Sequence, residues 1–479
     1  MLFNSLTFAV FLPIVFAAYW LLPHRFRWIL LLAASYYFYM SWNVKYVVLI
    51  LLTTVVSYLA AIGIEHSRTT RQKKCWLAGA AVISLGILFV FKYFNFAMDS
   101  LAAVMGMLAI PMHPVTLKLL LPVGISFYTF QTLSYVVDVY RGECPAEKHF
   151  GMYALFVSFF PQLVAGPIER TTNLLPQLKR EQTFSYSKAS YGLKLMAWGF
   201  FKKIVVADTL AVYVNNVYGN LSSHTGLSLI IASVFFAFQI YCDFSGYSDI
   251  AIGVSKLLGI DLMQNFRSPY FSGSVKEFWS RWHISLSTWF RDYVYIPLGG
   301  NRCGKLRHKL NLLITFLVSG LWHGANWTYV IWGGLHGLVQ IVETTVRPKK
   351  TQVSRGWKQV LSVLLVFVFT TAAWVFFRAE NLSDAIYVFL HAFDHITSPV
   401  QYVMQGLTGM ALTVLSCFEI LLMLAVLLLF DFFSLKRDTI VRISEMKPVL
   451  RWTIYVVFLL LMLYLLPTNP SGQFIYFQF

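Results

Sequence analysis

The sequence predicts an all-α, polytopic integral membrane protein. Of its 479 residues, 58% are hydrophobic and only 12% are charged, and the mean hydropathy is +0.63, a composition typical of membrane proteins. Apolar runs such as residues 46–64 and 411–433 reach the roughly 20 residues that a helix needs to cross a bilayer. Because lipid offers no hydrogen bonds to the backbone, open sheets are excluded and these runs are predicted to be helices.

Apolar stretches follow one another along the whole chain. The candidate spans are residues 6–22, 28–41, 45–64, 76–92, 117–138, 151–167, 190–216, 227–242, 309–322, 326–345, 358–377, 411–433 and 450–466. Pro161 and Pro167, with Gly166, interrupt one span, and Phe244-Ser245-Gly246 is expected to interrupt another. Broken helices at membrane depth usually line a cavity.

Both ends of the chain are expected to belong to the membrane domain. The opening MLFNSLTFAVFLPIVFAAYW lacks a basic n-region and an A-x-A cleavage site, so we predict a retained first span. We expect one membrane domain over residues 1–479, with residues 467–479 forming a tail beyond the last span.

Basic residues gather in the short loops between spans. These loops contain Arg25 and Arg27, then the basic residues within 68–74, 302–309, 347–358 and 436–451. Under the positive-inside rule the loops are cytoplasmic, so both termini are predicted to be extracytoplasmic. The formal net charge of +17 therefore reflects basic residues in the inner loops of a protein embedded in a lipid bilayer. Nucleic-acid binding is not expected. The five cysteines lack CxxC spacing, so neither a metal site nor a disulfide framework is predicted.

Two of the inner loops enclose a hairpin. Residues 310–322 lead to a tip, His323-Gly324-Ala325-Asn326, and a second apolar stretch returns to Val346. The first arm, at about 1.5 Å per residue, covers roughly 20 Å, so we expect His323 to lie partway across the bilayer.

His323 is the first candidate catalytic residue. Ionisable side chains within a membrane are costly and usually functional. With a pKa of about 6.5, an imidazole can take a proton from a hydroxyl and return it to a leaving group, as acyl transfer requires. The alternative is a hydrogen-bonded core histidine.

A second polar cluster covers residues 275–302 and is dense in basic and aromatic side chains. Within it, Lys276, Arg281 and Trp282 precede His283. Basic and aromatic groups suit an anionic, phosphate-bearing donor such as coenzyme A. The alternative is that half of this segment is an interfacial amphipathic helix with an aromatic belt.

Three further sets of polar residues are interpreted as structural. Asp243 and Asp249 are interpreted as a buried hydrogen-bond network that holds a kinked helix. Glu169-Arg170, which ends the motif LVAGPIER, is interpreted as an interfacial ion pair beside a kink. His336, in WGGLHG, is expected to pack against its glycine neighbours.

Three motifs together carry a resemblance to a known family. SGLWHGANWTYVIWGGLHG, FWSRWHISLSTWFRDYVYIPLGGNR and LVAGPIER resemble the membrane-bound O-acyltransferase family, in its bacterial branch that decorates envelope polysaccharides. The resemblance extends over nearly the whole chain, from its opening residues to the closing FIYFQF.

This resemblance implies a ring of helices around a central funnel or tunnel. It places the family's catalytic histidine on His323 and its second polar position on His283. It also implies a multi-pass protein of the bacterial plasma membrane that works with a separate extracytoplasmic transferase of the SGNH or esterase-like kind. The chain is most similar to the alginate and peptidoglycan O-acetylation proteins, and less to those that transfer D-alanine to teichoic acids.

The resemblance also gives Tyr476 a role. The terminal motif FIYFQF, residues 474–479, is implied to fold back into the funnel, where its tyrosine accepts the acyl group before passing it on. A phenol is a weak nucleophile unless a base such as His323 assists it. The alternative is an aromatic anchor at the outer interface.

Together these points predict a membrane O-acyltransferase. Acetyl-coenzyme A is the expected cytoplasmic donor, no bound cofactor is expected, and the acceptor is an extracytoplasmic polysaccharide such as alginate, peptidoglycan or cellulose. His323 is the expected general base, and His283 orients the donor or stabilises developing charge. The alternatives are a transporter or flippase without acyl chemistry, a D-alanyl transferase using a carrier protein, and a catalytically silent scaffold.

Overall fold

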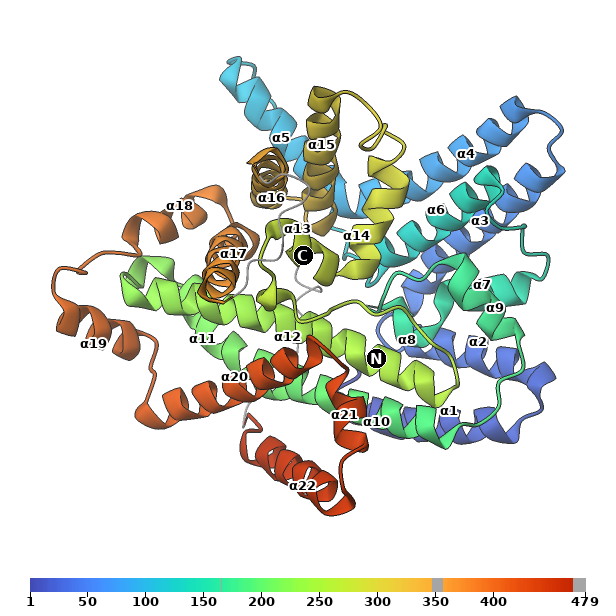
Figure 1. Cartoon of the computed structure of the whole chain (residues 1–479). Helices are drawn as coiled ribbons and strands as arrows, with labels where there is room; N and C mark the ends of the chain where they lie inside the picture. Colours follow the sequence, from blue (N-terminus) through green and yellow to red (C-terminus); the bar gives the residue numbers. More distant parts are fainter. Residues whose placement is uncertain (165, 347–355, 468–479) are drawn as a thin grey trace. The chain divides into compact units, whose positions relative to one another are not determined.

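The computed structural model describes residues 1–164, 166–346 and 356–467, and every regular element within these ranges is a helix (Figure 1). The all-α prediction is therefore confirmed. Five of the described helical segments are long and apolar enough to cross a membrane: Val44–His66, Thr70–Met107, Leu227–Leu257, Trp357–Arg378 and Val414–Ser434. The protein is accordingly an integral membrane protein.

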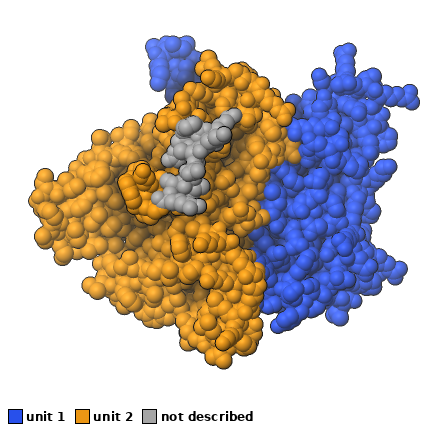
Figure 2. Space-filling view, viewed as in Figure 1, with its two compact units in different colours: residues 1–196, 250–263 blue, residues 197–249, 264–479 orange. Residues whose placement is uncertain are grey.

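The chain divides into two compact units, which are coloured separately in Figure 2. Unit 1 comprises residues 1–196 and 250–263. Its helices are α1 (Leu6–Leu21), α2 (His24–Met40), η1 (Val44–Tyr46), α3 (Val47–His66), α4 (Thr70–Leu88), η2 (Phe89–Tyr93), α5 (Phe94–Met107), α6 (Ile125–Arg141), α7 (Phe150–Ser158), α8 (Phe160–Leu163), α9 (Thr171–Lys179) and most of α10 (Tyr186–Phe200).

Unit 2 comprises residues 197–249 and 264–479, and contains both histidines that the sequence singles out as a pair, His283 and His323. Its helices are η3 (Phe201–Ala207), α11 (Asp208–Tyr218), η4 (Leu221–Ser223), most of α12 (Leu227–Leu257), η5 (Pro269–Phe271), α13 (Val275–Arg281), α14 (Ile284–Phe290), η6 (Arg291–Tyr295), α15 (Lys305–His323), α16 (Trp327–Val346), α17 (Trp357–Arg378), α18 (Leu382–His391), α19 (Pro399–Gly409), α20 (Val414–Ser434), α21 (Thr439–Ser444) and α22 (Pro448–Tyr464).

In unit 1, the predicted break beside Pro161 is confirmed. α7 ends at Ser158, Phe159 leaves helical geometry with a ψ of 109°, and Pro161 lies in the first turn of α8. A proline there sacrifices no hydrogen bond, because N–H groups of a first turn have no intrahelical acceptor. The backbone N–H of Phe160 instead donates to Ser35 Oγ at 3.1 Å. The break is thus fixed by a side chain of α2.

The motif LVAGPIER ends in a buried carboxylate of unit 1. Glu169 accepts hydrogen bonds from the backbone N–H of Met263 at 2.5 Å and from Asn173 Nδ2 at 2.7 Å. Burial raises the pKa of Glu169 to about 7. The sequence predicts an interfacial ion pair here, whereas these two hydrogen bonds come from a backbone amide and a side-chain amide. They join the start of α9 to residues 261–263, which supports a structural role.

The predicted interruption at Phe244-Ser245-Gly246 is wrong. α12 is one continuous helix of 31 residues, because the glycine serves packing rather than a turn. A Cβ on Gly246 would lie 2.7 Å from the carbonyl oxygen of Gly199 in α10, closer than real Cβ atoms come to other atoms. Glycine therefore lets the two backbones approach, at a helix-propensity cost of about 1 kcal/mol.

The span predicted at residues 117–138 also begins too early. α6 starts at Ile125, after Gly124 has taken a left-handed conformation with φ of 76°. A glycine adopts this conformation without the Cβ clash that other residues meet. The apolar residues before it resemble a span in composition but are not helical.

In unit 2, α15 and α16 form the predicted hairpin, joined by Gly324, Ala325 and Asn326. The first arm is longer than expected, because α15 begins at Lys305 and has 19 residues. Its opening turns contain basic residues that the sequence predicts to lie in the preceding loop. Lysine and arginine are good helix formers, so the apolar run alone underestimated the helix.

Two glycines bring the hairpin arms together. A Cβ on Gly320 would lie 2.2 Å from the carbonyl oxygen of Tyr329, and one on Gly333 would lie 2.2 Å from that of Phe316. Both obstacles are backbone atoms, which cannot move aside as a side chain can. The small residues therefore set the separation of α15 and α16, as is common between membrane helices.

Gly320→Ala is expected to lower the free energy of unfolding by about 1–3 kcal/mol, because the added methyl forces the two backbones apart. The measurement is thermal unfolding of the purified protein in detergent. Gly334→Ala is the matched control, since a Cβ there meets only the flexible Leu317 side chain at 3.4 Å. Equal unfolding temperatures for the two variants would contradict the conclusion that Gly320 sets the separation of α15 and α16.

Candidate active site

His323 is the last residue of α15 and lies inside a cluster of aromatic rings. His323 is only 3% exposed. The imidazole centroid lies 5.0 Å from Trp322, 5.0 Å from Trp332 and 5.4 Å from Phe377. These rings come from α15, α16 and α17, so three helices build the surroundings of one titratable group.

His283 lies in the same cluster. It is fully buried and precedes α14. Its ring centroid lies 4.5 Å from that of Phe244 and 6.2 Å from that of Trp322. Because Trp322 also contacts His323, the structure brings the two predicted histidines together around one indole.

A cluster of this kind suits proton transfer between bound groups. Aromatic rings exclude water and lower the local dielectric constant, which strengthens interactions with any charge that develops there. A neutral imidazole in such surroundings can act as a base without a metal ion or a carboxylate nucleophile. Among the described residues, no group of three or more His, Cys, Asp or Glu side chains could hold a metal ion.

Comparison with known proteins bears on the chemistry of this cluster. The model of the membrane-bound O-acyltransferase family matches residues 149–382, a range that includes His283 and His323. The chain is 42% identical over 388 residues to a probable alginate O-acetylase AlgI of Azotobacter vinelandii, covering 80% of this chain and 76% of that protein. It is 37% identical over 420 residues to a peptidoglycan O-acetyltransferase of Helicobacter pylori, covering 81% and 79%.

The chain belongs to the membrane-bound O-acyltransferase family. It is therefore an enzyme that transfers acyl groups to oxygen atoms. A more distant relative, a teichoic acid D-alanyltransferase of Bacillus subtilis, is 27% identical over 356 residues, covering 70% of this chain and 85% of that protein.

The residues predicted to bind the donor of this O-acyltransferase are in different surroundings. Trp282 is 1% exposed and packs against Trp374 at 5.0 Å between centroids. Lys276 is exposed, and the Arg281 guanidinium pairs with Glu277 at 2.6 Å. Trp282 thus joins the aromatic cluster, whereas the two basic side chains lie outside it.

Residues 275–302 form two short helices, α13 and α14, and the π-helical turn η6 rather than one continuous helix. α13 ends at Arg281, and His283 takes a left-handed conformation with φ of 43° before α14 begins. That conformation is rare for a residue with a Cβ and is seen mostly where function or packing requires it. The turn directs the chain so that His283 enters the core.

A carboxylate on α16 holds the start of α13. Glu343 accepts from the backbone N–H of Val275 at 2.9 Å through Oε1 and from that of Lys276 at 3.1 Å through Oε2. These N–H groups have no intrahelical acceptor, and a negative charge at a helix N-terminus is favourable.

Glu343→Ala is expected to lower the free energy of unfolding by about 1–2 kcal/mol, the usual cost of a lost cap. Thermal unfolding measures this loss. Glu343→Gln keeps one acceptor oxygen and should fall between the wild type and Glu343→Ala. An unchanged midpoint for the alanine variant would show that the cap contributes nothing.

His336 packs in the core, as expected. It is fully buried, and its Nδ1 accepts a hydrogen bond from Trp279 Nε1 at 3.2 Å. Because an indole N–H can only donate, the proton of neutral His336 lies on Nε2. Neither this Nε2–H nor the Nε1–H of Trp332 has a hydrogen-bond acceptor among the described residues. A buried N–H without an acceptor is costly, so donors of this kind suit the carbonyl oxygen of a bound acyl group.

Asp243 and Asp249 take part in a buried ionic network rather than in the aromatic cluster. Asp243 pairs with Lys203 at 2.7 Å and Asp249 with Lys202 at 2.6 Å. Lys203 also pairs with Asp208 at 2.8 Å. The two lysines are consecutive residues of η3, a π-helical turn, and α12 provides both facing carboxylates. The structural interpretation is therefore supported, although α12 is unbroken.

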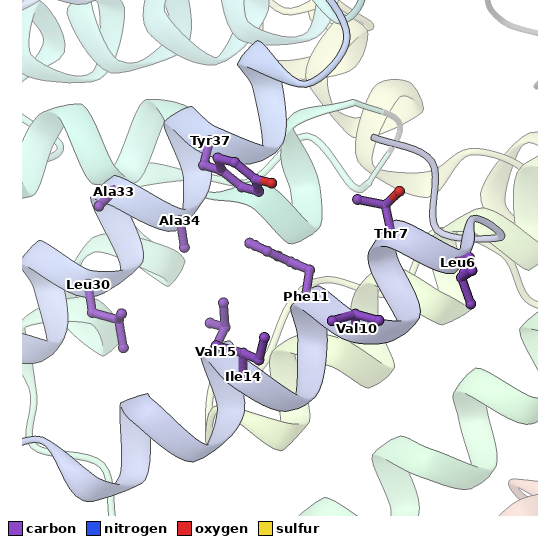
Figure 3. Close-up of a pocket in the computed structure, with 10 residues that line it drawn as sticks. All are labelled: Leu6, Thr7, Val10, Phe11, Ile14, Val15, Leu30, Ala33, Ala34 and Tyr37. Atoms are coloured by element: carbon purple, nitrogen blue, oxygen red, sulfur yellow. The ribbon is translucent and has the colours of Figure 1, made fainter.

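One apolar cavity of the described structure lies away from the predicted site residues. An apolar crevice of about 690 Å³ lies between α1 and α2 in unit 1 (Figure 3). Its lining residues are Leu6, Thr7, Val10, Phe11, Ile14, Val15, Leu30, Ala33, Ala34 and Tyr37. None of the predicted site residues lines it. Tyr476, the predicted acyl relay, lies outside the described residues.

Sequence reasoning missed Trp332, Phe377 and Asn265, which contact the two histidines. Trp332 and Phe377 pack against His323, and Asn265 hydrogen-bonds to His283 at 3.0 Å from 18 residues away. A single sequence contains no local signal for such contacts, because they arise between separate helices and loops. Only the density of tryptophan around each histidine indicated that the surroundings are aromatic.

Proposed function

We propose that this O-acyltransferase takes acetyl groups from acetyl-coenzyme A at the cytoplasmic side and delivers them for O-acetylation of an extracytoplasmic polysaccharide of the alginate or peptidoglycan type. The observation that carries the proposal is the buried His323 within its aromatic cluster at the turn of the α15–α16 hairpin. The acyl group and polymer class rest on the relatives, whose names specify acetylation at 42% and 37% identity but D-alanylation at 27%.

In the proposed reaction, His323 acts as the general base. Its imidazole takes the proton of an acceptor hydroxyl while the hydroxyl oxygen attacks the thioester carbonyl carbon. The carbon–sulfur bond then breaks, and the imidazolium returns the proton to the leaving thiolate. An ester and a free thiol result, so atoms and protons balance without a metal ion or an added cofactor.

Delivery outside the cell requires at least one further acceptor. We place both termini on the extracytoplasmic face of the bacterial plasma membrane, in line with the basic inner loops. Tyr476 is then the first acceptor, and an SGNH or esterase-like transferase outside the membrane passes the acetyl group to the polysaccharide. Two successive transfers of the same chemistry carry the acyl group across without moving coenzyme A.

Label transfer tests this proposal. The purified protein in proteoliposomes is supplied with acetyl-coenzyme A labelled in the acetyl group, and the label is located by intact mass and peptide mapping. We expect label on Tyr476 in the wild type and none in Tyr476→Phe. Label from a D-alanyl carrier thioester, but none from acetyl-coenzyme A, would overturn the donor. Movement of an unmodified precursor across the bilayer without label transfer would favour a transporter instead.

A further inference from the structure

Asn265 is clamped against the turn that contains His283. Both residues are fully buried in unit 2. The backbone oxygen of Asn265 accepts from the N–H of Ile284 at 2.9 Å, and the N–H of Arg267 donates to the oxygen of Arg281 at 2.9 Å. Residues 265–267 therefore run alongside residues 281–284, held by the backbone at both ends of this segment.

The orientation of the Asn265 amide group follows from its partners. The backbone N–H of Ser285 lies 3.2 Å from Oδ1, and a backbone N–H can only donate. The Ser285 hydroxyl also donates to Oδ1, at 2.9 Å. On the other side, Nδ2 donates to Ser248 Oγ at 3.2 Å. An exchanged oxygen and nitrogen would set N–H against N–H, so the amide has one orientation.

That orientation fixes the tautomer of His283. Its Nδ1 lies 3.0 Å from Asn265 Oδ1, and an amide oxygen can only accept. The proton is therefore on Nδ1, and Nε2 of the neutral ring carries the lone pair. Burial lowers the pKa of His283 well below its usual value, which keeps the ring neutral. The rings of Phe244, Phe266 and Trp322 pack against it, and none of them is charged.

We propose that Asn265 is a positioning residue that holds His283 with Nε2 as a hydrogen-bond acceptor, so that His283 receives an N–H or O–H donor of the substrates. This inference rests on the proposed acetyl-transfer function. In this arrangement His283 does not stabilise an oxyanion, because the one N–H of the neutral ring already donates to Asn265.

The left-handed turn at His283 supports this role. A φ of 43° is unfavourable for a residue with a Cβ, yet the bonds from Asn265 to residues 283–285 hold it. His336 provides an internal comparison, because its Nδ1 accepts from Trp279 and its proton is consequently on Nε2. Two buried histidines of one cluster thus have opposite tautomers, set by the hydrogen bond to Asn265 in His283 and by that from Trp279 in His336.

The donor group has two possible sources, which kinetics distinguish. The pantetheine arm of coenzyme A contains amide N–H groups, and the acceptor contains a hydroxyl. If His283 orients the donor, Asn265→Leu should raise KM for acetyl-coenzyme A with a smaller change in kcat. If it receives the acceptor hydroxyl, kcat should fall by about 100-fold or more while KM stays near the wild-type value.

Asn265→Asp separates positioning from a purely structural contribution. A carboxylate still accepts from Nδ1–H, so the tautomer and activity at alkaline pH should survive. The added negative charge favours the imidazolium, so the acidic limb of the pH–rate profile should move upward by about 1 pH unit or more. Asn311→Asp is the matched control, since Asn311 is equally buried but its amide donates to Gly300 O; its profile should not move.

A spectroscopic measurement keeps the inference independent of activity. Nitrogen NMR of the histidine-labelled full-length protein, with His283 assigned by comparison with His283→Gln, should show a protonated Nδ1 and an unprotonated Nε2. The reverse tautomer, or an Asn265→Asp profile that coincides with the wild type, would overturn the role of Asn265. A wild type that shows the expected nitrogen signals but does not use acetyl-coenzyme A would overturn only the proposed function.

Discussion

Replacement of His323 by alanine is expected to lower acetyl transfer from acetyl-coenzyme A by about a thousandfold or more. General acid–base catalysis contributes about 10²–10⁴ to a rate, and in the proposed reaction one imidazole serves both the attacking hydroxyl and the leaving thiolate. The measurement is release of free coenzyme A thiol by the purified protein, followed over time for wild type and variant at equal concentrations.

The folded state must survive for this loss to be informative. His323 is packed between Trp322, Trp332 and Phe377, so the thermal unfolding midpoint is recorded for each variant. His323→Gln retains most of the side-chain volume and is expected to lose activity to a similar extent. His308→Ala is the control on the same helix, near its N-terminal end, and should remain active. Wild-type turnover by a folded His323→Ala protein would show that His323 is not the general base.

Lys203→Met is expected to produce the largest loss of stability. The Lys203 side chain is 4% exposed, and those of Asp208 and Asp243 are 3% exposed each. Removing one partner of a buried ionic cluster leaves charge in a low-dielectric environment, which typically costs about 3–5 kcal/mol. Thermal or denaturant unfolding in detergent should show this as a large drop in the midpoint.

An exposed ion pair offers the matched comparison. Lys188 pairs with Asp261 at 2.8 Å, but these side chains are 45% and 47% exposed. Lys188→Met should therefore cost only about 0–1 kcal/mol. The double variant Lys203→Met/Asp243→Leu is expected to be more stable than Lys203→Met alone, because it removes one of the carboxylates as well. If Lys203→Met unfolds at the same temperature as Lys188→Met, the network does not stabilise the fold.

Much of the fold was predictable because a membrane helix requires a continuous run of apolar residues, which is visible in the sequence. Apolar runs of sufficient length, and the proline at 161, identified helices and a break that the structure contains. The prediction of a helix break failed at Gly246, because a glycine can indicate either a break or a close packing contact. Gly246 suggested an interruption, but it packs against the carbonyl oxygen of Gly199, and sequence alone does not show which backbone lies opposite a glycine.

The candidate site was predictable in part. The hairpin turn at His323 followed from two basic loops that enclose a pair of apolar stretches. His323 was singled out as an ionisable residue at membrane depth, and His283 by its basic and aromatic neighbours in the sequence. Of Lys276, Arg281 and Trp282, which the sequence suggests as one donor-binding group, only Trp282 enters the aromatic cluster. Residue type alone does not decide whether a side chain faces a core or a surface.

The sequence by itself determined that the protein is a helical membrane protein and that His323 lies at a turn between two helices, because hydropathy and loop charge are properties of neighbouring residues. Only the tertiary structure decided that His283 packs against Trp322, the residue before His323, and that Asn265 fixes the tautomer of His283. Those contacts join separate segments through packing and directional hydrogen bonds, and their partners are defined only once the helices have assembled.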